Sequence, residues 1–208
     1  MAKLLHDGPK SSPYRLLLAH GAGAGMDTPF MRGVANALAA RAIRVTRFEF
    51  PYMQRRVGGA RSAPDRMPVL LESYRAVVAQ LGEASELFIG GKSMGGRVAS
   101  MIADELGVAG LVCLGYPFHP PDKPDKTRTD HLRALKTRCL IVQGTRDPFG
   151  TQEDVAGYVL SKRICVRWIE DGDHSWLTRR KLGHDPTVAF AEACEAIGMF
   201  VIDRRKRR

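Results

Sequence analysis

The stretch of residues 86–106 constrains the fold of this chain more than any other part of the sequence. Its first residues, Glu86–Gly90, form a short apolar run suited to a buried parallel strand. Gly91-Lys92-Ser93-Met94-Gly95 comes next, a G-x-S-x-G turn that pushes a serine hydroxyl out above a sheet by straining its backbone. The apolar residues that follow have the spacing of one helix face: Met94, Val98, Met101, Ile102 and Leu106. Strand, turn and helix in this order predict that Ser93 is a nucleophile.

The glycines on either side of Ser93 support this interpretation. A Cβ at Gly91 or Gly95 would collide with the neighbouring strand or helix. The five-residue pattern is weak alone, because a chain with 21 glycines can produce it by chance in an ordinary strand–helix connection. Its place between a buried strand and an amphipathic helix favours a nucleophile turn.

Five further β-type runs accompany the one before Ser93, and amphipathic segments separate them. The runs cover 14–19, 43–50, 86–90, 110–114, 139–143 and 164–169, and the helical segments lie near 28–41, 68–82, 94–106, 130–136, 151–161 and 186–202. This alternation predicts an α/β fold with a mostly parallel sheet covered by helices on both faces. Because the sequence has no internal repeat or linker, residues 1–203 are expected to form one domain, followed by a basic disordered tail at 204–208.

Composition limits the class of protein. At 208 residues, 44% hydrophobic and 26% charged, the chain is expected to form one soluble core. No run approaches the roughly 20 apolar residues of a membrane helix, so no membrane partner is expected. The four cysteines have no metal-ligand or redox spacing, and no signal peptide is visible. These features predict a cytoplasmic monomer or homodimer without a metal or cofactor.

The net charge of +10 comes in part from the run Arg204–Arg208. Such a run could contact a nucleic acid or an acidic surface through salt-sensitive interactions. A solvated chain end that keeps the protein soluble is the favoured interpretation. Since no aromatic stacking motif, zinc finger or helix-turn-helix pattern accompanies the charge, no nucleic-acid partner is expected.

Two long irregular stretches, 51–67 and 115–129, each follow a predicted strand. They should therefore lie at the carboxyl edge of the sheet, where open α/β folds bind ligands. Long loops inside a compact domain are usually functional or mobile. Neither stretch is long enough to be a separate cap domain.

A catalytic serine needs a base that takes its proton and an acid that orients the base. His174 follows the last predicted strand directly and is favoured as the base over His20 and His184. Asp147, just after the fifth strand, is favoured as the acid, although Asp-Pro pairs also occur as simple turns. The competing acids are Asp171 and Asp173, and the second is so close to His174 in sequence that a straight carboxylate–Nδ1 bond would be awkward.

The oxyanion that forms during acyl transfer needs two backbone N–H donors. Met94, directly after the nucleophile, is expected to supply one. The loop His20–Gly25 is expected to supply the other, with Ala22 as first choice and Gly23 as second. A phosphate-binding role for this loop is the alternative. It is disfavoured because the loop lacks both the dinucleotide-binding pattern and the Lys-Ser/Thr pair of a P-loop.

Together these motifs resemble a small α/β-hydrolase without a cap domain, similar to the dienelactone-hydrolase-like group. More narrowly, the chain resembles bacterial relatives of the hydrolase-like domain of a non-specific-lethal chromatin complex subunit. The matching segments are spread over nearly the whole chain, at 20–27, 48–53, 91–97, 115–120, 144–147 and 173–175. The resemblance implies a Ser–Asp–His hydrolase, with Ser93, Asp147 and His174 at the matching positions and in the expected chain order.

The resemblance also implies a sheet topology. The chain begins at the strand that matches the third of the family, so the first two antiparallel strands are expected to be missing. With the six runs numbered along the chain, a six-stranded sheet in the spatial order 2-1-3-4-5-6 is expected. The eukaryotic relatives of the narrower group include candidate scaffold proteins, and the substrate therefore does not follow from the resemblance.

Four arginines in the first irregular stretch bear on the substrate: Arg55, Arg56, Arg61 and Arg66. They could form an electropositive rim for a substrate with a carboxylate or phosphate, with Arg55 and Arg56 as the contacts. Simple surface arginines that pair with Asp65 and Glu72 are the slightly favoured alternative. In the second irregular stretch, Tyr116 and His119 are candidate substrate contacts.

The leading hypothesis is a serine hydrolase of a small ester, thioester or amide, of the carboxylesterase or thioesterase type, whose substrate could be acidic. The alternative is a non-catalytic binding or scaffold protein that retains the fold. An intact serine, acid and histidine favour the first.

Overall fold

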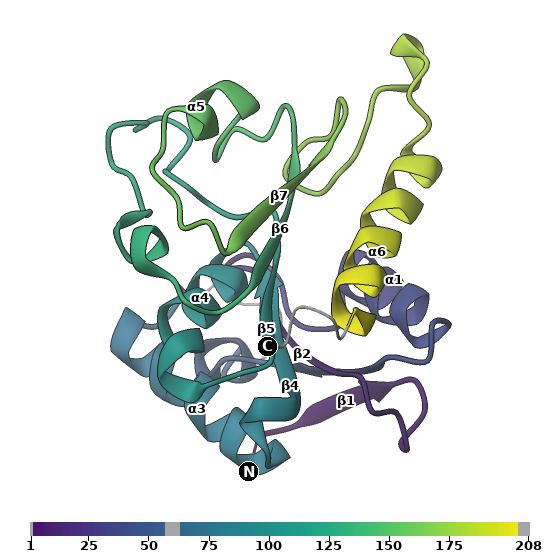
Figure 1. Ribbon diagram of the computed structural model, residues 1–208, viewed down its shortest axis with the longest axis vertical. Helices are drawn as coiled ribbons and strands as arrows, with labels where there is room; N and C mark the ends of the chain where they lie inside the picture. The colour runs from purple at the N-terminus through teal and green to yellow at the C-terminus, as the bar shows by residue number, and fades with distance from the viewer. Residues whose placement is uncertain (1, 57–62, 204–208) are drawn as a thin grey trace.

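The computed structural model describes residues 2–56 and 63–203, which form a seven-stranded sheet with helices on both faces (Figure 1). The strands are β1 (Leu4–Asp7), β2 (Arg15–Ala19), β3 (Arg44–Phe48), β4 (Leu87–Lys92), β5 (Gly110–Leu114), β6 (Cys139–Gly144) and β7 (Ile164–Ile169). Their spatial order is β1-β3-β2-β4-β5-β6-β7. All neighbouring pairs are parallel except β1 and β3, which run antiparallel.

Helices cover the two faces in pairs. The longer helices are α1 (Pro29–Ala39), α3 (Met67–Leu81), α4 (Met94–Leu106) and α6 (Pro186–Ile202). Figure 1 shows α1 and α6 together on one side of the sheet and α3 and α4 on the other. The short elements are α2 (Pro51–Gln54), η1 (Ala84–Glu86), η2 (Asp130–Ala134), α5 (Gln152–Ala156) and η3 (Arg180–Leu182).

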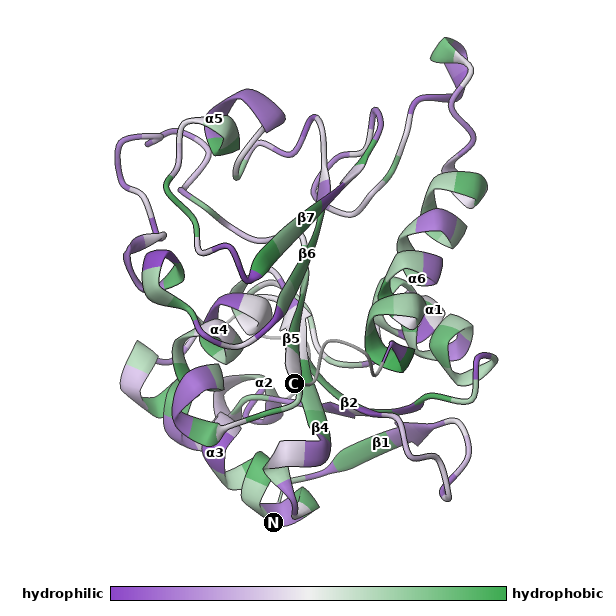
Figure 2. Ribbon diagram, viewed as in Figure 1, coloured by the Kyte–Doolittle hydropathy of each residue, from purple (hydrophilic) through white to green (hydrophobic). Residues whose placement is uncertain are grey.

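The core is divided by the sheet because strand side chains alternate between its faces. In β2, Leu17 and Ala19 pack under α3 and α4, whereas Leu16 and Leu18 pack under α1 and α6. β5 is apolar along its whole length, and β6 is apolar up to Gln143. The longer helices mix apolar and polar residues, as Figure 2 shows. The predicted α/β fold with helices on both faces is confirmed.

The strand order expected for the six runs is confirmed, but the expected number of strands is wrong. β1 adds a seventh, antiparallel strand at the edge, so one antiparallel strand is present before β2. Its side chains tie it to β3: Asp7 pairs with Arg47 at 3.0 Å, and His6 Nδ1 lies 3.1 Å from Thr46 Oγ1. The sequence pattern missed it because four residues at a sheet edge carry little periodicity.

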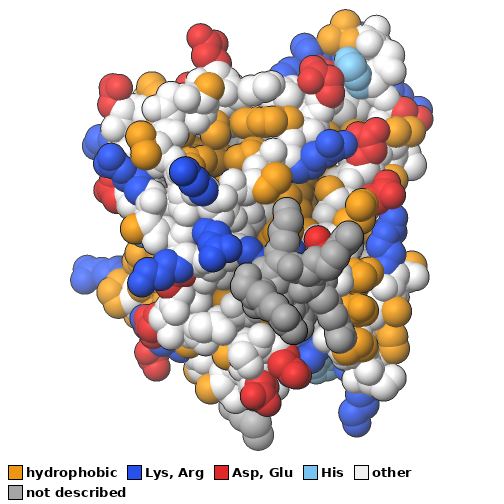
Figure 3. Space-filling view, in the orientation of Figure 1, with side chains coloured by type: hydrophobic (Ala, Val, Ile, Leu, Met, Phe, Trp, Pro, Cys, Tyr) orange, Lys and Arg blue, Asp and Glu red, His pale blue; other side chains and the backbone are white. Residues whose placement is uncertain are grey.

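The basic run 204–208 and Arg61 lie outside the described residues. In the part of the chain that the structure describes, no helix has the length and apolarity to cross a bilayer. On the face in Figure 3, Lys and Arg side chains are scattered among acidic and hydrophobic ones and form no single patch.

Candidate active site

Ser93 occupies the tight turn between β4 and α4. Its backbone has φ 50° and ψ −114°, a strained conformation for a residue with a side chain. The close approach of β2 explains the glycines around it. A Cβ on Gly95 would come within 2.6 Å of the carbonyl oxygens of Ala19 and His20, and one on Gly91 would overlap Ala19. The local geometry is that of a nucleophile turn.

The other predicted site residues gather at the same edge because parallel strands end together. Asp147 follows β6, His174 follows β7, and the loop Gly21–Gly25 follows β2. His174 Nδ1 lies 2.7 Å from Asp147 Oδ2, and the carboxylate is fully buried. Since a carboxylate only accepts, Nδ1 carries the proton, and Nε2 is left with the lone pair that a general base needs.

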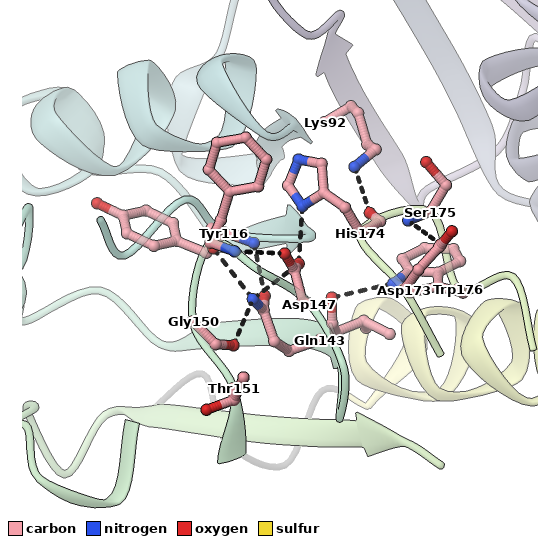
Figure 4. Close-up of polar contacts among 12 residues, drawn as sticks. Lys92, Tyr116, Gln143, Asp147, Gly150, Thr151, Asp173, His174, Ser175 and Trp176 are labelled. Atoms are coloured by element: carbon pink, nitrogen blue, oxygen red, sulfur yellow. Dashed lines mark hydrogen bonds and ion pairs between the residues drawn. The ribbon is translucent and has the colours of Figure 1, made fainter. Parts of the chain in front are cut away.

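Asp147 is held by a buried polar network centred on Gln143, which is drawn in Figure 4. Gln143 Nε2 donates to Asp147 Oδ2 at 2.9 Å and lies within 3.2 Å of the carbonyl oxygens of Tyr116 and Gly150. Its Oε1 accepts from the Tyr116 N–H at 2.7 Å, and Asp147 Oδ1 accepts from the Phe149 N–H at 2.9 Å. This network fixes the carboxylate that contacts His174. Gln143 was not singled out from the sequence; a polar residue at the end of the apolar run of β6 was the available signal.

The loop expected to hold an oxyanion is fixed through its carbonyl groups. The hydroxyl of Tyr52 donates to Ala22 O at 2.9 Å, and His20 Nδ1 donates to Gly21 O at 2.6 Å. In a trans peptide the N–H points away from the C=O, so the N–H groups of Ala22 and Gly23 face away from these partners. Met94 is the first residue of α4, and its N–H has no partner within the helix.

His20 is a structural residue in this arrangement. It is fully buried, and its Nε2 accepts from the Phe50 N–H at 3.1 Å while Nδ1 donates to Gly21. Burial lowers the pKa of His20, which keeps the ring neutral. The imidazole links the ends of β2 and β3 and has no nitrogen left for base chemistry.

Lys92, the residue before the serine, is buried beside His174. Its Nζ donates to the His174 carbonyl oxygen at 2.5 Å (Figure 4). Nζ also lies 5.5 Å from the centre of the Phe30 ring. Burial lowers the pKa of Lys92 to about 8, although the carboxylates of Asp147 and Asp173 act in the opposite direction. Its ammonium group therefore supports the segment that carries His174 and adds positive charge at the site.

The competing acids have other roles. Asp171 pairs with Arg179 and Arg146, and the hydrogen bond from Arg179 holds the pKa of Asp171 well below its usual range. Asp173 Oδ1 accepts from the N–H groups of Ser175 and Leu177 at 2.7 and 3.0 Å, so it shapes the turn around His174.

Two cavities meet at Ser93, and both also contact Ala22 and Phe149. The histidine cavity, of about 400 Å³, is lined by the loop Gly21–Gly25, Phe30, Lys92, Phe149 and His174. The arginine cavity, of about 350 Å³, is lined by Met94 and by the charged residues Asp65, Arg97 and Arg128. Ser93 therefore opens onto two differently built compartments.

The predicted substrate contacts line neither cavity within the described residues. Arg55 pairs with Asp65 at 2.5 Å, and Arg56 donates to Gly23 O at 3.0 Å. Tyr116 is fully buried and His119 is 3% exposed, with Nδ1 donating to Pro120 O at 2.8 Å. Arg97 and Arg128, which do line a cavity, were not singled out from the sequence. The position of Arg97 four residues after Ser93, one helical turn along the same face, was the available signal.

A second serine–histidine contact lies deeper in the molecule. Ser100 Oγ, on a residue 3% exposed within α4, lies 2.8 Å from His131 Nε2. Ser100 also donates to the Arg97 carbonyl oxygen at 2.7 Å. A hydroxyl has one proton to donate, so His131 Nε2 must be the donor toward Ser100. A protonated Nε2 cannot take the proton of Ser100, and this contact joins α4 to η2.

Residues 12–202 match the profile of a known family, described as alpha/beta hydrolase domain. The chain belongs to this family. The observed fold, with Ser93 on its strand-to-helix turn, agrees with this family.

Solved structures of lid-less and esterase-type α/β-hydrolases have the same fold. The chain is similar to XC6422 from Xanthomonas campestris, an α/β serine hydrolase without lid (TM-score 0.69, 21% identity, 95% of this chain and 87% of that one). It is also similar to an α/β serine hydrolase homologue from Coxiella burnetii (0.68, 18%, 96% and 89%). A third is Est1E from Butyrivibrio proteoclasticus, solved with ferulic acid bound (0.68, 15%, 94% and 93%).

Proposed function

We propose that this protein is a serine hydrolase that cleaves a small ester, thioester or amide through an acyl-enzyme on Ser93, with His174 as the base and Asp147 as the orienting acid. The observation that carries the proposal is the 2.7 Å bond between His174 Nδ1 and the buried Asp147, at the sheet edge where Ser93 stands on a strained turn. A base held in one tautomer next to a strained serine is the arrangement that acyl transfer requires.

The reaction has two halves. Ser93 Oγ attacks the carbonyl carbon while His174 Nε2 takes its proton, and the N–H groups of Met94 and Ala22, or alternatively Gly23, hold the oxyanion. His174 then gives the proton to the leaving group, which departs and leaves an ester on Ser93. In the second half, His174 activates a water molecule that hydrolyses this ester. No hydrogen bond joins Ser93 to His174 within the described residues, and such bonds often tighten only when substrate is present.

The size of the site favours a small substrate. The two cavities at Ser93 have volumes of about 400 and 350 Å³. Only short elements such as α2, η2 and α5 stand at this edge in the described part of the chain, and the XC6422 structure has no lid either. That Est1E has been solved with ferulic acid supports a compact acyl or alcohol group.

Labelling with a fluorophosphonate probe tests the proposal. The wild-type protein should take the label, Ser93→Ala should not, and His174→Ala should label far more slowly. Ser100→Ala is the matched control, and it should label at the wild-type rate. A folded wild-type protein that takes no label would favour the non-catalytic binding protein instead, and a loss of labelling in Ser100→Ala would move the chemistry to the Ser100–His131 contact.

A further inference from the structure

We propose that Arg97 and Arg128 form a carboxylate-binding subsite for the acyl half of the substrate, so that Ser93 acts preferentially on esters whose acyl chain ends in a carboxylate. This inference rests on the proposed serine-hydrolase function. It assigns a substrate class and places its recognition at two residues other than the Arg55 and Arg56 considered from the sequence.

The first observation is that both arginines lack a carboxylate partner. Neither guanidinium forms a hydrogen bond or an ion pair in the described parts of the chain, 2–56 and 63–203. Nε of Arg97 is buried without any hydrogen-bond partner. Leaving such a donor unpaired costs about 1–3 kcal/mol, and more for a charged group. A ligand that accepts a hydrogen bond from this donor would remove that cost, which favours binding.

The second observation is that Arg97 and Arg128 line the same cavity. Burial lowers the pKa of Arg128, and the charge of Arg97 lowers it further. Arg97 acts in the same direction on the buried His131. Two partly buried guanidinium groups repel each other, and a bound carboxylate would reduce this repulsion. The planar arrangement of their N–H donors also matches the two oxygens of a carboxylate.

Asp65 is the acidic residue that lines the same cavity. Its Oδ1 is paired with Arg55 at 2.5 Å, so its charge is matched from the other side. Its Oδ2 is buried and has no hydrogen-bond partner. With Asp65 matched by Arg55, no acidic residue of the described segments pairs with Arg97 or Arg128. Met67, Leu70 and Pro117 add apolar lining to the cavity.

The direction of the substrate follows from the position of the base. His174 must donate its proton to the leaving group. Since His174 lines the histidine cavity, the leaving group lies in that cavity. The acyl group then extends into the arginine cavity on the other side of Ser93, past Met94. Arg97 follows Ser93 by one turn of α4, which places the subsite a short acyl chain away from the reacting carbonyl.

Paired substrates test this proposal: the 4-nitrophenyl half-esters of succinic, glutaric and adipic acid against the neutral butyrate, valerate and hexanoate. With spontaneous hydrolysis subtracted, the wild type should prefer at least one half-ester in kcat/KM. Arg97→Gln and Arg128→Gln should each lower the ratio of acidic to neutral kcat/KM by about 10- to 100-fold, the range for a hydrogen bond to a charged group, and mainly through KM. Arg97→Lys should restore part of the ratio. Arg133→Gln, an exposed arginine of η2, is the control and should keep the wild-type ratio.

The outcomes separate the two claims. If the wild type takes no fluorophosphonate label and hydrolyses none of these esters, the proposed function fails and the subsite with it. If it labels and hydrolyses the neutral esters with no preference for any half-ester, the subsite alone is overturned. A preference for 4-acetoxybenzoate, whose carboxylate lies in the alcohol half, that disappears in Arg97→Gln would overturn the assigned direction of the substrate.

Discussion

The two cavities that meet at Ser93 differ in how their polar groups are satisfied. On the histidine side, Asp147, Gln143 and His174 are joined by hydrogen bonds of 2.7 to 2.9 Å. On the arginine side, Arg97 and Arg128 have no acidic partner in the described residues. A satisfied network holds a geometry, whereas an unsatisfied charge favours whatever ligand compensates it. This difference supports the proposal that the first side carries out the chemical step and the second selects the substrate.

The largest effect is expected at Ser93, which both cavities contact. Ser93→Ala removes the nucleophile without altering the packed strands, so kcat/KM for every ester should fall by at least about 10³-fold. The factor by which kcat/KM falls should be the same for acidic and neutral esters. Steady-state hydrolysis of the paired 4-nitrophenyl esters measures it, and a variant with more than a tenth of wild-type activity would contradict the role of Ser93.

Gln143→Leu tests whether the satisfied side depends on its network. The change leaves the Tyr116 N–H and the Gly150 carbonyl unpaired in the core and removes one bond to Asp147. The free energy of unfolding should fall by about 3 kcal/mol, since each buried unpaired group costs about 1–3 kcal/mol. Urea denaturation measures this. The matched control is Gln152→Leu at an exposed position of α5, where a change below about 0.5 kcal/mol is expected.

In the histidine cavity, Lys92→Met should change stability and activity in opposite directions. The charged form of Lys92 is disfavoured by burial, which lowers its pKa from 10.5 to about 8. Between those values the unfolded chain binds more protons than the folded one, so wild-type stability should rise as the pH rises through this window. Lys92→Met should lose this rise and be more stable at pH 7, by on the order of 1–3 kcal/mol.

The same variant should lose activity. Without the bond from Nζ to the His174 carbonyl, the base is held less firmly, and kcat should fall by about tenfold or more. Thermal unfolding across pH 7–10 and ester hydrolysis at pH 7 measure the two effects. A variant that is less stable than the wild type at pH 7 would show that the burial of Lys92 is compensated.

The smallest effect is expected when an unpaired arginine is removed. Arg97→Gln relieves repulsion and removes a buried unpaired donor, so the free energy of unfolding should stay within about 0.5 kcal/mol or rise. Arg47 is the matched comparison. It is 3% exposed but bonded to Asp7, Asp27 and the Met26 carbonyl, so Arg47→Gln should destabilise by about 2 kcal/mol or more. Equal losses in both variants would mean that Arg97 has a structural partner.

The features that the sequence predicted correctly are those set by residues close together in the chain. The strand, turn and helix around Ser93 and the six runs from β2 to β7 all follow from periodicity and turn chemistry. Asp147 and His174 were found because parallel strands end at one edge. In the structure, His174 Nδ1 and Asp147 Oδ2 are within hydrogen-bond distance, as predicted.

The rest depended on which side chains meet in space. Among the described residues, Arg55 has an acidic partner and Arg97 has none, and a partner 10 residues away in the chain cannot be inferred from spacing. Gln143 holds the network at Asp147 because it also contacts the carbonyl oxygens of Tyr116 and Gly150, which lie in loops outside β6. β1 was missed because a four-residue strand at a sheet edge carries little periodicity, and the ion pair that ties it to β3 joins Asp7 to Arg47, 40 residues away.

The most direct test of the account is to trap the acyl-enzyme and locate it. The protein would be mixed briefly with the 4-nitrophenyl half-ester of glutaric acid, quenched in acid and digested, and the modified peptide identified by mass spectrometry. The account predicts a glutaryl group on Ser93, absent in Ser93→Ala and formed more slowly in Arg97→Gln than in Arg133→Gln. A glutaryl group on Ser100, or none on a folded wild-type protein that hydrolyses the ester, would contradict it.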